Sequence, residues 1–203
     1  MVQKKGFTLI ELIIVIALIA LLATTVILVI NPVKIFREAR DSQRIADIGQ
    51  MNSALSLYMG TASSPSLGAC SASANCYTHV LGLGASSGCG IGGVPRYTPN
   101  NATVNATTTT GIAGNNGWVP VKLSDASGGS PLSAWPVDPK ASILSGVATS
   151  SYYYSYACDA NSQWEFTAHM ESTRYAATGG DDVETTDGGN QTNLFEVGTN
   201  VQL

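Results

Sequence analysis

The feature that most constrains this chain is a long apolar run near its start that contains a single carboxylate. The run extends from Phe7 to Ile30, and apart from three threonines its one polar residue is Glu11. About 20 apolar residues are enough for a helix to cross the hydrocarbon core of a bilayer. An ionised carboxylate inside such a helix is costly, so Glu11 is interpreted as a functional residue that has a partner.

The segment KKGFTLIE, residues 4–11, places two lysines, a glycine and a phenylalanine directly before this carboxylate. It resembles the type III signal sequence of type IV pilins and pseudopilins. The resemblance implies that a prepilin peptidase cleaves after Gly6 and that Phe7 becomes the methylated N-terminus. It also implies that Glu11 acts in the assembly of subunits into a filament.

Two other interpretations of this segment are weaker. A secretory signal peptide has an apolar core of about 7–15 residues and a small-residue cleavage site, whereas this run is longer and leads into Asn31 and Pro32. An ordinary signal anchor explains the length and the lysines. It predicts no glutamate within the span.

Charge is divided unevenly between the two parts of the chain. Residues 1–59 hold six Lys and Arg against four Asp and Glu, while residues 60–203 hold four against ten. The positive-inside rule places the N-terminal lysines in the cytoplasm, so we expect a single-pass precursor in the cytoplasmic membrane with its acidic part exported. An acidic exported part has no basic stripe, and no nucleic-acid partner is expected.

All four cysteines lie in the exported part, at Cys70, Cys76, Cys89 and Cys158. An oxidising compartment favours two disulfides, for which three connectivities are possible. Among them we expect a local Cys70–Cys76 bridge and a Cys89–Cys158 bridge. A metal site completed by His79 and His169 is the alternative, but no close cysteine pair supports it.

Residues 31–59 predict an amphipathic helix. Its apolar residues recur every three or four positions and share one face: Ile45, Ile48, Met51, Leu55 and Tyr58. Pro32 predicts a kink where the helix leaves the membrane. Most charges here are interpreted as a solvated face, with Lys34/Glu38 and Arg37/Asp41 as exposed pairs.

The resemblance continues through residues 37–60. Pseudopilins and many pilins carry a similar run, matched here by Arg37, Asp41, Arg44, Asp47, Ile48, Ala54, Leu55 and Tyr58. The segment WPVDP, residues 135–139, resembles the turn that precedes the sheet in pseudopilin-like proteins, with Trp135 in place of an aliphatic residue.

The exported part has a weaker pattern. Residues 60–117 are rich in Gly, Ser, Ala, Thr and Asn without apolar periodicity, which predicts a long loop and not a regular sheet. Residues 118–123 predict a short strand, and residues 151–158 and 163–170 predict a hairpin. The second hairpin strand alternates apolar and polar residues, as a half-buried strand does. Residues 193–197 are a further strand candidate.

The tail, residues 178–198, carries four carboxylates that are calcium candidates: Asp181, Asp182, Glu184 and Asp187. The resemblance suggests this because major pseudopilins bind calcium in a C-terminal loop. The spacing departs from that of an EF-hand, so a flexible acidic loop is the favoured interpretation. No other cofactor is expected.

Together these segments predict an α+β pilin fold, in which a long N-terminal helix packs on a small antiparallel β-sheet. We divide the chain into a leader peptide (1–6), a filament-core helix (7–30), an amphipathic helix (31–59), a loop region (60–117) and a sheet with an acidic tail (118–203).

No nucleophile motif, phosphate loop or zinc-protease helix occurs, so an enzyme is not expected. The resemblance implies a filament subunit whose partners are copies of itself, a prepilin peptidase, a platform membrane protein and an assembly ATPase. A surface pilus for adhesion, motility or DNA uptake is favoured, and a type II secretion pseudopilus remains the alternative. In another class, a membrane-anchored extracellular binding module would stay in the membrane without polymerising.

Overall fold

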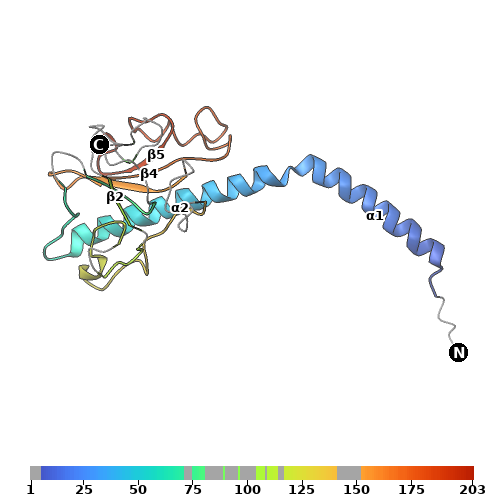
Figure 1. Ribbon diagram of the computed structural model, residues 1–203, viewed down its shortest axis with the longest axis horizontal. Coiled ribbons are helices and arrows are strands. Elements are labelled where there is room, and N and C mark those ends of the chain that lie inside the picture. The colour runs from blue at the N-terminus through green and yellow to red at the C-terminus, as the bar shows by residue number, and fades with distance from the viewer. Residues whose placement is uncertain are drawn as a thin grey trace. The chain divides into compact units, whose positions relative to one another are not determined.

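The computed structural model describes residues 6–70, 75–80, 89, 96, 104–107, 109–113, 117–140 and 152–203. The chain forms two compact units, Met1–Arg37 and Glu38–Leu203. The elements in chain order are α1 (Leu9–Ile30), α2 (Pro32–Thr61), β1 (Cys76–Thr78), β2 (Val104–Ala106), the 3₁₀ turn η1 (Leu123–Asp125), β3 (Ser155–Cys158), β4 (Trp164–Ala168) and β5 (Phe195–Gly198) (Figure 1).

The first unit holds α1 and the start of α2. The two helices are separated at Asn31, whose backbone is left-handed with φ 46° and ψ 80°, a conformation that asparagine tolerates better than most residues. Pro32 then begins α2, where its missing N–H costs no helical hydrogen bond. The interruption predicted near Pro32 is confirmed. Asn31 and Pro32 cause it together.

The second unit holds a five-stranded sheet in the order β2-β1-β3-β4-β5. The pairs β1/β3, β3/β4 and β4/β5 are antiparallel, and β2 joins β1 in parallel. The expectation of no regular sheet in residues 60–117 is wrong, because β1 and β2 lie there. Each has three residues, too few for an alternating pattern to stand out in the sequence.

The predicted hairpin is confirmed, with Cys158 opposite Trp164 at its closed end, and β5 confirms the closing strand near residues 193–197. The strand expected at residues 118–123 is wrong. Trp118, Val119 and Val121 are fully buried, but they belong to an irregular segment that fills the core without pairing to the sheet.

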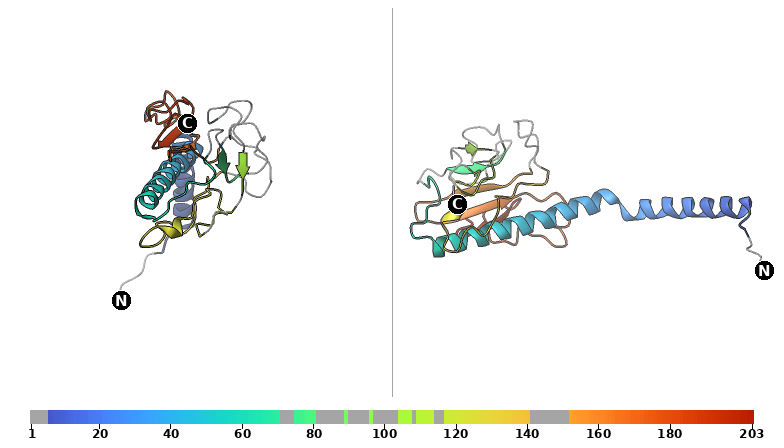
Figure 2. Two further views of the ribbon diagram at one scale, coloured as in Figure 1. Left: turned by 90° about the vertical axis from the view of Figure 1, so that its left-hand side faces the viewer. Right: turned by 90° about the horizontal axis from the view of Figure 1, so that it is seen from below.

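Helix α2 lies beside the sheet and supplies one wall of the core (Figure 2). Its buried apolar residues are Ile48, Met51, Ala54, Leu55 and Tyr58, which confirms the predicted face except that Ile45 is only partly buried. Two hydrogen bonds attach the helix to the sheet side. Trp164 Nε1 donates to Asn52 Oδ1 at 2.9 Å, and the Tyr154 hydroxyl donates to Asp47 Oδ2 at 2.8 Å.

Strand β4 is buried on both faces, which corrects the expectation of a half-buried strand. Trp164, Phe166 and Ala168 join the core beneath α2. The alternating residues Glu165 and Thr167 are also fully buried. Residues with charged or hydroxyl side chains therefore line a second, covered face of the sheet.

Candidate processing and assembly site

Gly6 and Phe7 form an open segment in front of α1. Neither residue is helical, and the Phe7 side chain is 93 % exposed. A Cβ added to Gly6 would meet no atom within 4 Å. The folded chain thus gives no internal reason for glycine at this position, and a requirement for it would have to come from a partner that binds this peptide bond.

Glu11 closes the N-terminus of α1 through a capping box with Thr8. Its Oε2 accepts the Thr8 N–H at 2.8 Å and the Thr8 hydroxyl at 2.7 Å, while Glu11 N–H donates to Thr8 Oγ1 at 3.3 Å. The motif Thr-x-x-Glu before an apolar run is a sequence signal for this capping box. We had predicted only an intermolecular role for Glu11, so this local role is an addition. No described residue donates a hydrogen bond to Oε1, so that oxygen can accept another donor.

Helix α1 has the length and composition to cross a membrane. Residues Leu9–Ile27 have a mean hydropathy of 2.8, and none of that window is buried in the described part of the chain. The hydroxyls of Thr24 and Thr25 donate to the carbonyls of Ala20 at 2.6 Å and Leu22 at 2.8 Å. Because polar groups in lipid must be satisfied internally, these bonds make both threonines compatible with a bilayer.

Residues 1–27 match a family model described as the prokaryotic N-terminal methylation motif, which is the signal sequence of type IV pilins and prepilins. The chain is therefore type IV pilin-like or pseudopilin-like at its N-terminus, and the motif points to a structural protein. With the apolar helix that follows, it is consistent with a membrane-anchored precursor. Searches of curated proteins and of solved structures found no match.

A buried ion-pair cluster lies in the second unit, and no pattern in the sequence predicted it. Arg44 is fully buried. Its Nε–H donates a hydrogen bond to Asp138 Oδ2 at 2.7 Å, and its Nη1–H donates one to Asp41 Oδ1 at 2.6 Å. Asp41 also accepts the backbone N–H groups of Glu171 at 2.8 Å and Ser172 at 2.6 Å. The expectation that Asp41 lies on an exposed surface is wrong.

This cluster joins three segments that are distant in sequence: α2, the WPVDP turn and the segment after β4. Burial alone would lower the pKa of Arg44, but the hydrogen bonds and charges of Asp138 and Asp41 outweigh it and raise the pKa. Arg40 and Lys140 both pair with Glu171 at 2.8 Å. The hydrogen bond from Arg40 is the largest cause that lowers the pKa of Glu171 to about 2.

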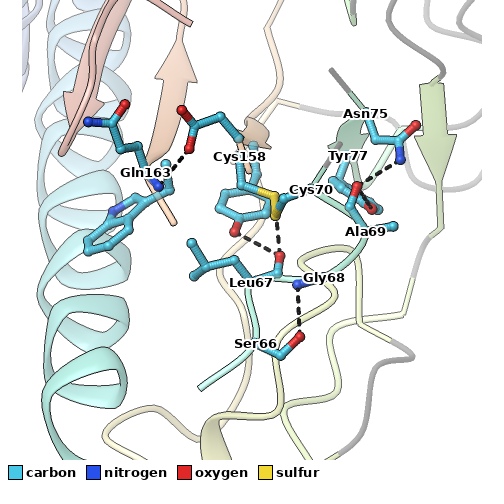
Figure 3. The surroundings of a disulfide bond; sticks show 12 residues. Ser66, Leu67, Gly68, Ala69, Cys70, Asn75, Tyr77, Cys158 and Gln163 are labelled. Atoms are coloured by element: carbon cyan, nitrogen blue, oxygen red, sulfur yellow. Dashed lines mark hydrogen bonds between the residues drawn. A yellow bond between two sulfur atoms is a disulfide. The ribbon is translucent and has the colours of Figure 1, made fainter. Parts of the chain in front are cut away.

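The cysteines form two disulfides, but the expected pairing is wrong. Cys70 is bonded to Cys158, and Cys76 is bonded to Cys89. Figure 3 shows the first bridge, which attaches the segment after α2 to the end of β3. Beside it, Leu67 O accepts the Tyr156 hydroxyl at 3.0 Å and Ala69 O accepts Asn75 Nδ2 at 2.8 Å. We had paired Cys70 with Cys76 because they are close in sequence. Cys76 lies in β1, however, and is bonded to Cys89.

Donors of this chain contact all four acidic residues of the tail. Asp181 pairs with Arg174 at 2.5 Å, and Asp182 accepts the Thr185 N–H at 3.0 Å. Glu184 is buried and accepts the Met170 N–H at 2.8 Å, while Asp187 accepts the Glu196 N–H at 2.6 Å. Among the described residues, no group of three or more His, Cys, Asp or Glu could hold a metal ion.

The two histidines lie in different settings. His79 is fully buried against Trp118 and Tyr154, and burial lowers its pKa to about 4, which keeps the ring neutral at physiological pH. His169 is partly exposed, stacks on the Tyr152 ring and contacts Asn193 O at 2.7 Å.

Proposed function

We propose that the protein is the structural subunit of a type IV pilus-like filament, cleaved after Gly6 and polymerised through its N-terminal helix. The observation that carries the proposal is the methylation motif over residues 1–27, a segment that contains Gly6, Phe7 and Glu11. The favoured filament is a surface pilus. Its partners would be copies of this chain, a prepilin peptidase, a platform membrane protein and an assembly ATPase.

Glu11 would set the register between neighbouring subunits. Cleavage creates a free α-amine at Phe7, and the Glu11 carboxylate of an adjacent copy can pair with it when both groups leave water. The capping box supports this role, because both Thr8 hydrogen bonds fall on Oε2. A carboxylate accepts several hydrogen bonds, so Oε1 can bind an ammonium group while the cap stays in place.

The exposed apolar surface of α1 supports the same proposal. Large side chains such as Ile10 and Leu21 are more than half exposed, at 65 % and 62 %. Lipid covers such a surface in the precursor. In a filament the helices of neighbouring copies would cover it, so extraction moves this surface from lipid into protein without exposing it to water.

The proposal is tested by the N-terminus and the assembly state of the native protein. Intact mass or N-terminal sequencing should give a mature chain that starts at Phe7, and the Gly6→Leu variant should keep its leader, residues 1–6. Sheared filaments that contain the subunit should be visible by electron microscopy. A mature start near residues 24–32 would establish an ordinary signal peptide, and processed protein that never polymerises would establish a membrane-anchored binding module.

A second candidate is a pseudopilin of a type II secretion system. It is favoured by the contact between Arg44 in the helix run and Asp138 in the WPVDP turn, because both segments resemble those of pseudopilins. Deleting the gene would then block protein secretion without removing surface filaments. Loss of surface filaments with normal secretion favours the pilus.

A further inference from the structure

Two glutamates lie side by side on the sheet face that turns away from α2. In the antiparallel pairing of β4 with β5, Thr167 is opposite Glu196 and Glu165 is opposite Gly198. Glu165 and Glu196 therefore project from the same face as diagonal neighbours, a relation in which long side chains can touch. Both are buried, with 0 % and 2 % of their surface exposed.

Their hydrogen bonds involve the C-terminal segment. Glu165 Oε2 accepts the Leu203 N–H at 3.2 Å, and Glu196 Oε2 accepts the Gln191 N–H at 2.9 Å. Glu196 Oε1 is buried and accepts no hydrogen bond from a described residue. A protonated Glu165 can donate to the Glu196 carboxylate, whereas two carboxylates can only repel each other.

Among the described residues, the charged groups near the pair are one further carboxylate, Asp187, and one guanidinium, Arg96. Asp187 approaches Glu196 from the preceding loop, where it accepts the Glu196 N–H. On β3 the residue opposite Glu165 is Ala157. Arg96 lies on the same sheet face, where it donates to Thr167 Oγ1 and Tyr153 O, and His169 contacts Glu184 farther along.

We propose that Glu165 and Glu196 share one proton and form a pH-sensitive latch that holds β5 and the C-terminal segment on β4. On the covered face the two carboxyl side chains lie diagonally across the junction of β4 with β5. When one carboxyl is protonated, the pair forms a hydrogen bond between the two strands. Without that proton, two negative charges are buried next to each other beside Asp187.

The direction of the pH dependence follows from proton linkage. Burial is the largest cause that raises the pKa of Glu165, and it also raises the pKa of Glu196 and Asp187. A carboxyl whose pKa is raised by folding contributes stability that is complete below the pKa of the unfolded chain. That stability is lost as the pH rises toward the pKa of the folded state. The latch is therefore closed in mild acid and weakens at alkaline pH.

The test uses the full mature protein in detergent, with thermal unfolding measured from pH 5 to pH 9. For one retained proton, the folded-to-unfolded ratio of the wild type should fall by about tenfold per pH unit across the alkaline side. Glu165→Gln keeps the shape and a donor but cannot ionise, so it should flatten this slope and raise Tm at pH 9. Glu196→Gln should do the same and serves if the first variant does not fold.

Asp125→Asn is the matched control, because Asp125 is an exposed carboxylate that pairs with Lys122 at 2.8 Å. It should leave the slope unchanged. Amide hydrogen exchange, corrected for intrinsic pH effects, should show that β5 loses protection relative to α2 between pH 5 and pH 9 in the wild type alone. Equal slopes in the wild type and both Gln variants would overturn the latch. So would a Tm increase with millimolar calcium that both Gln variants abolish, because a cation would then hold the pair.

Discussion

At the scale of single residues, Glu11 has two roles that substitutions can separate. Glu11→Gln keeps an acceptor for the Thr8 N–H and so keeps the capping box, whereas Glu11→Ala removes both the cap and the charge. If the carboxylate neutralises the Phe7 amine of a neighbour, both variants should be inserted and processed normally. Both should lose filaments by at least about tenfold, since one member of a desolvated pair is left alone.

The measurement is the amount of sheared filament and of mature protein in the membrane for the wild type and both variants. Normal filament yield from Glu11→Gln together with loss from Glu11→Ala would assign the defect to the helix cap. The charge pairing would then be wrong.

Arg44 gives a second prediction at this scale. Arg44→Met fills a similar volume but leaves Asp41 and Asp138 buried without their cation, so the free energy of unfolding should fall by about 3–5 kcal/mol. Lys122→Met is the control, because its pair with Asp125 has side chains that are 46 % and 50 % exposed, and such surface pairs contribute about 0–1 kcal/mol. Denaturant unfolding measures both. Equal losses would contradict the buried cluster as a stabilising feature.

At the scale of elements, Gly49 in the middle of α2 is not required by the packing of this chain. It lines an open groove of about 680 Å³ with Ile45, Leu57 and Leu132, and a Cβ added there would meet no atom within 4 Å. Gly49→Ala should therefore raise the free energy of unfolding by about 0.5–1 kcal/mol, because alanine favours the helix and restricts the unfolded chain.

Gly198→Ala is the contrasting variant, because a Cβ in β5 would overlap the carbonyl oxygen of Trp164. Its Tm should fall while that of Gly49→Ala rises. A lower Tm for Gly49→Ala would show that α2 tolerates no side chain at this groove.

At the scale of the whole molecule, the two disulfides should differ in their contribution to stability. Cys70–Cys158 closes a separation of 88 residues and Cys76–Cys89 one of 13. By the chain-entropy relation, the first constrains the unfolded chain by about 4.6 kcal/mol and the second by about 2.9 kcal/mol.

Replacing Cys70 and Cys158 by serine should lower Tm more than replacing Cys76 and Cys89, and thermal unfolding of the two double variants compares them directly. Non-reducing peptide mapping of the wild type checks the pairing itself. The reverse order of Tm values would show that the short bridge carries native contacts that outweigh loop length.

The local features of this protein can be predicted from neighbouring residues. The apolar run and the KKGFTLIE segment predicted the membrane-length helix and the processing motif, and Pro32 predicted the interruption after it. Two strand-like runs, of which the second alternates apolar and polar residues, predicted the hairpin of β3 and β4. These features are encoded by neighbouring residues through helical period, strand period and turn chemistry, so they can be found without knowledge of the fold.

Contacts between residues that are distant in sequence depend on how the strands and helices pack. Arg44 and Asp138 are 94 positions apart, and nothing in either local pattern distinguishes a buried ion pair from two solvated charges. The disulfide pairing and the burial of Glu165 beside Glu196 likewise could not be predicted from local sequence patterns. Each depends on where β1 and β5 join the sheet, and strands of three or four residues carry too little periodic signal to fix their partners.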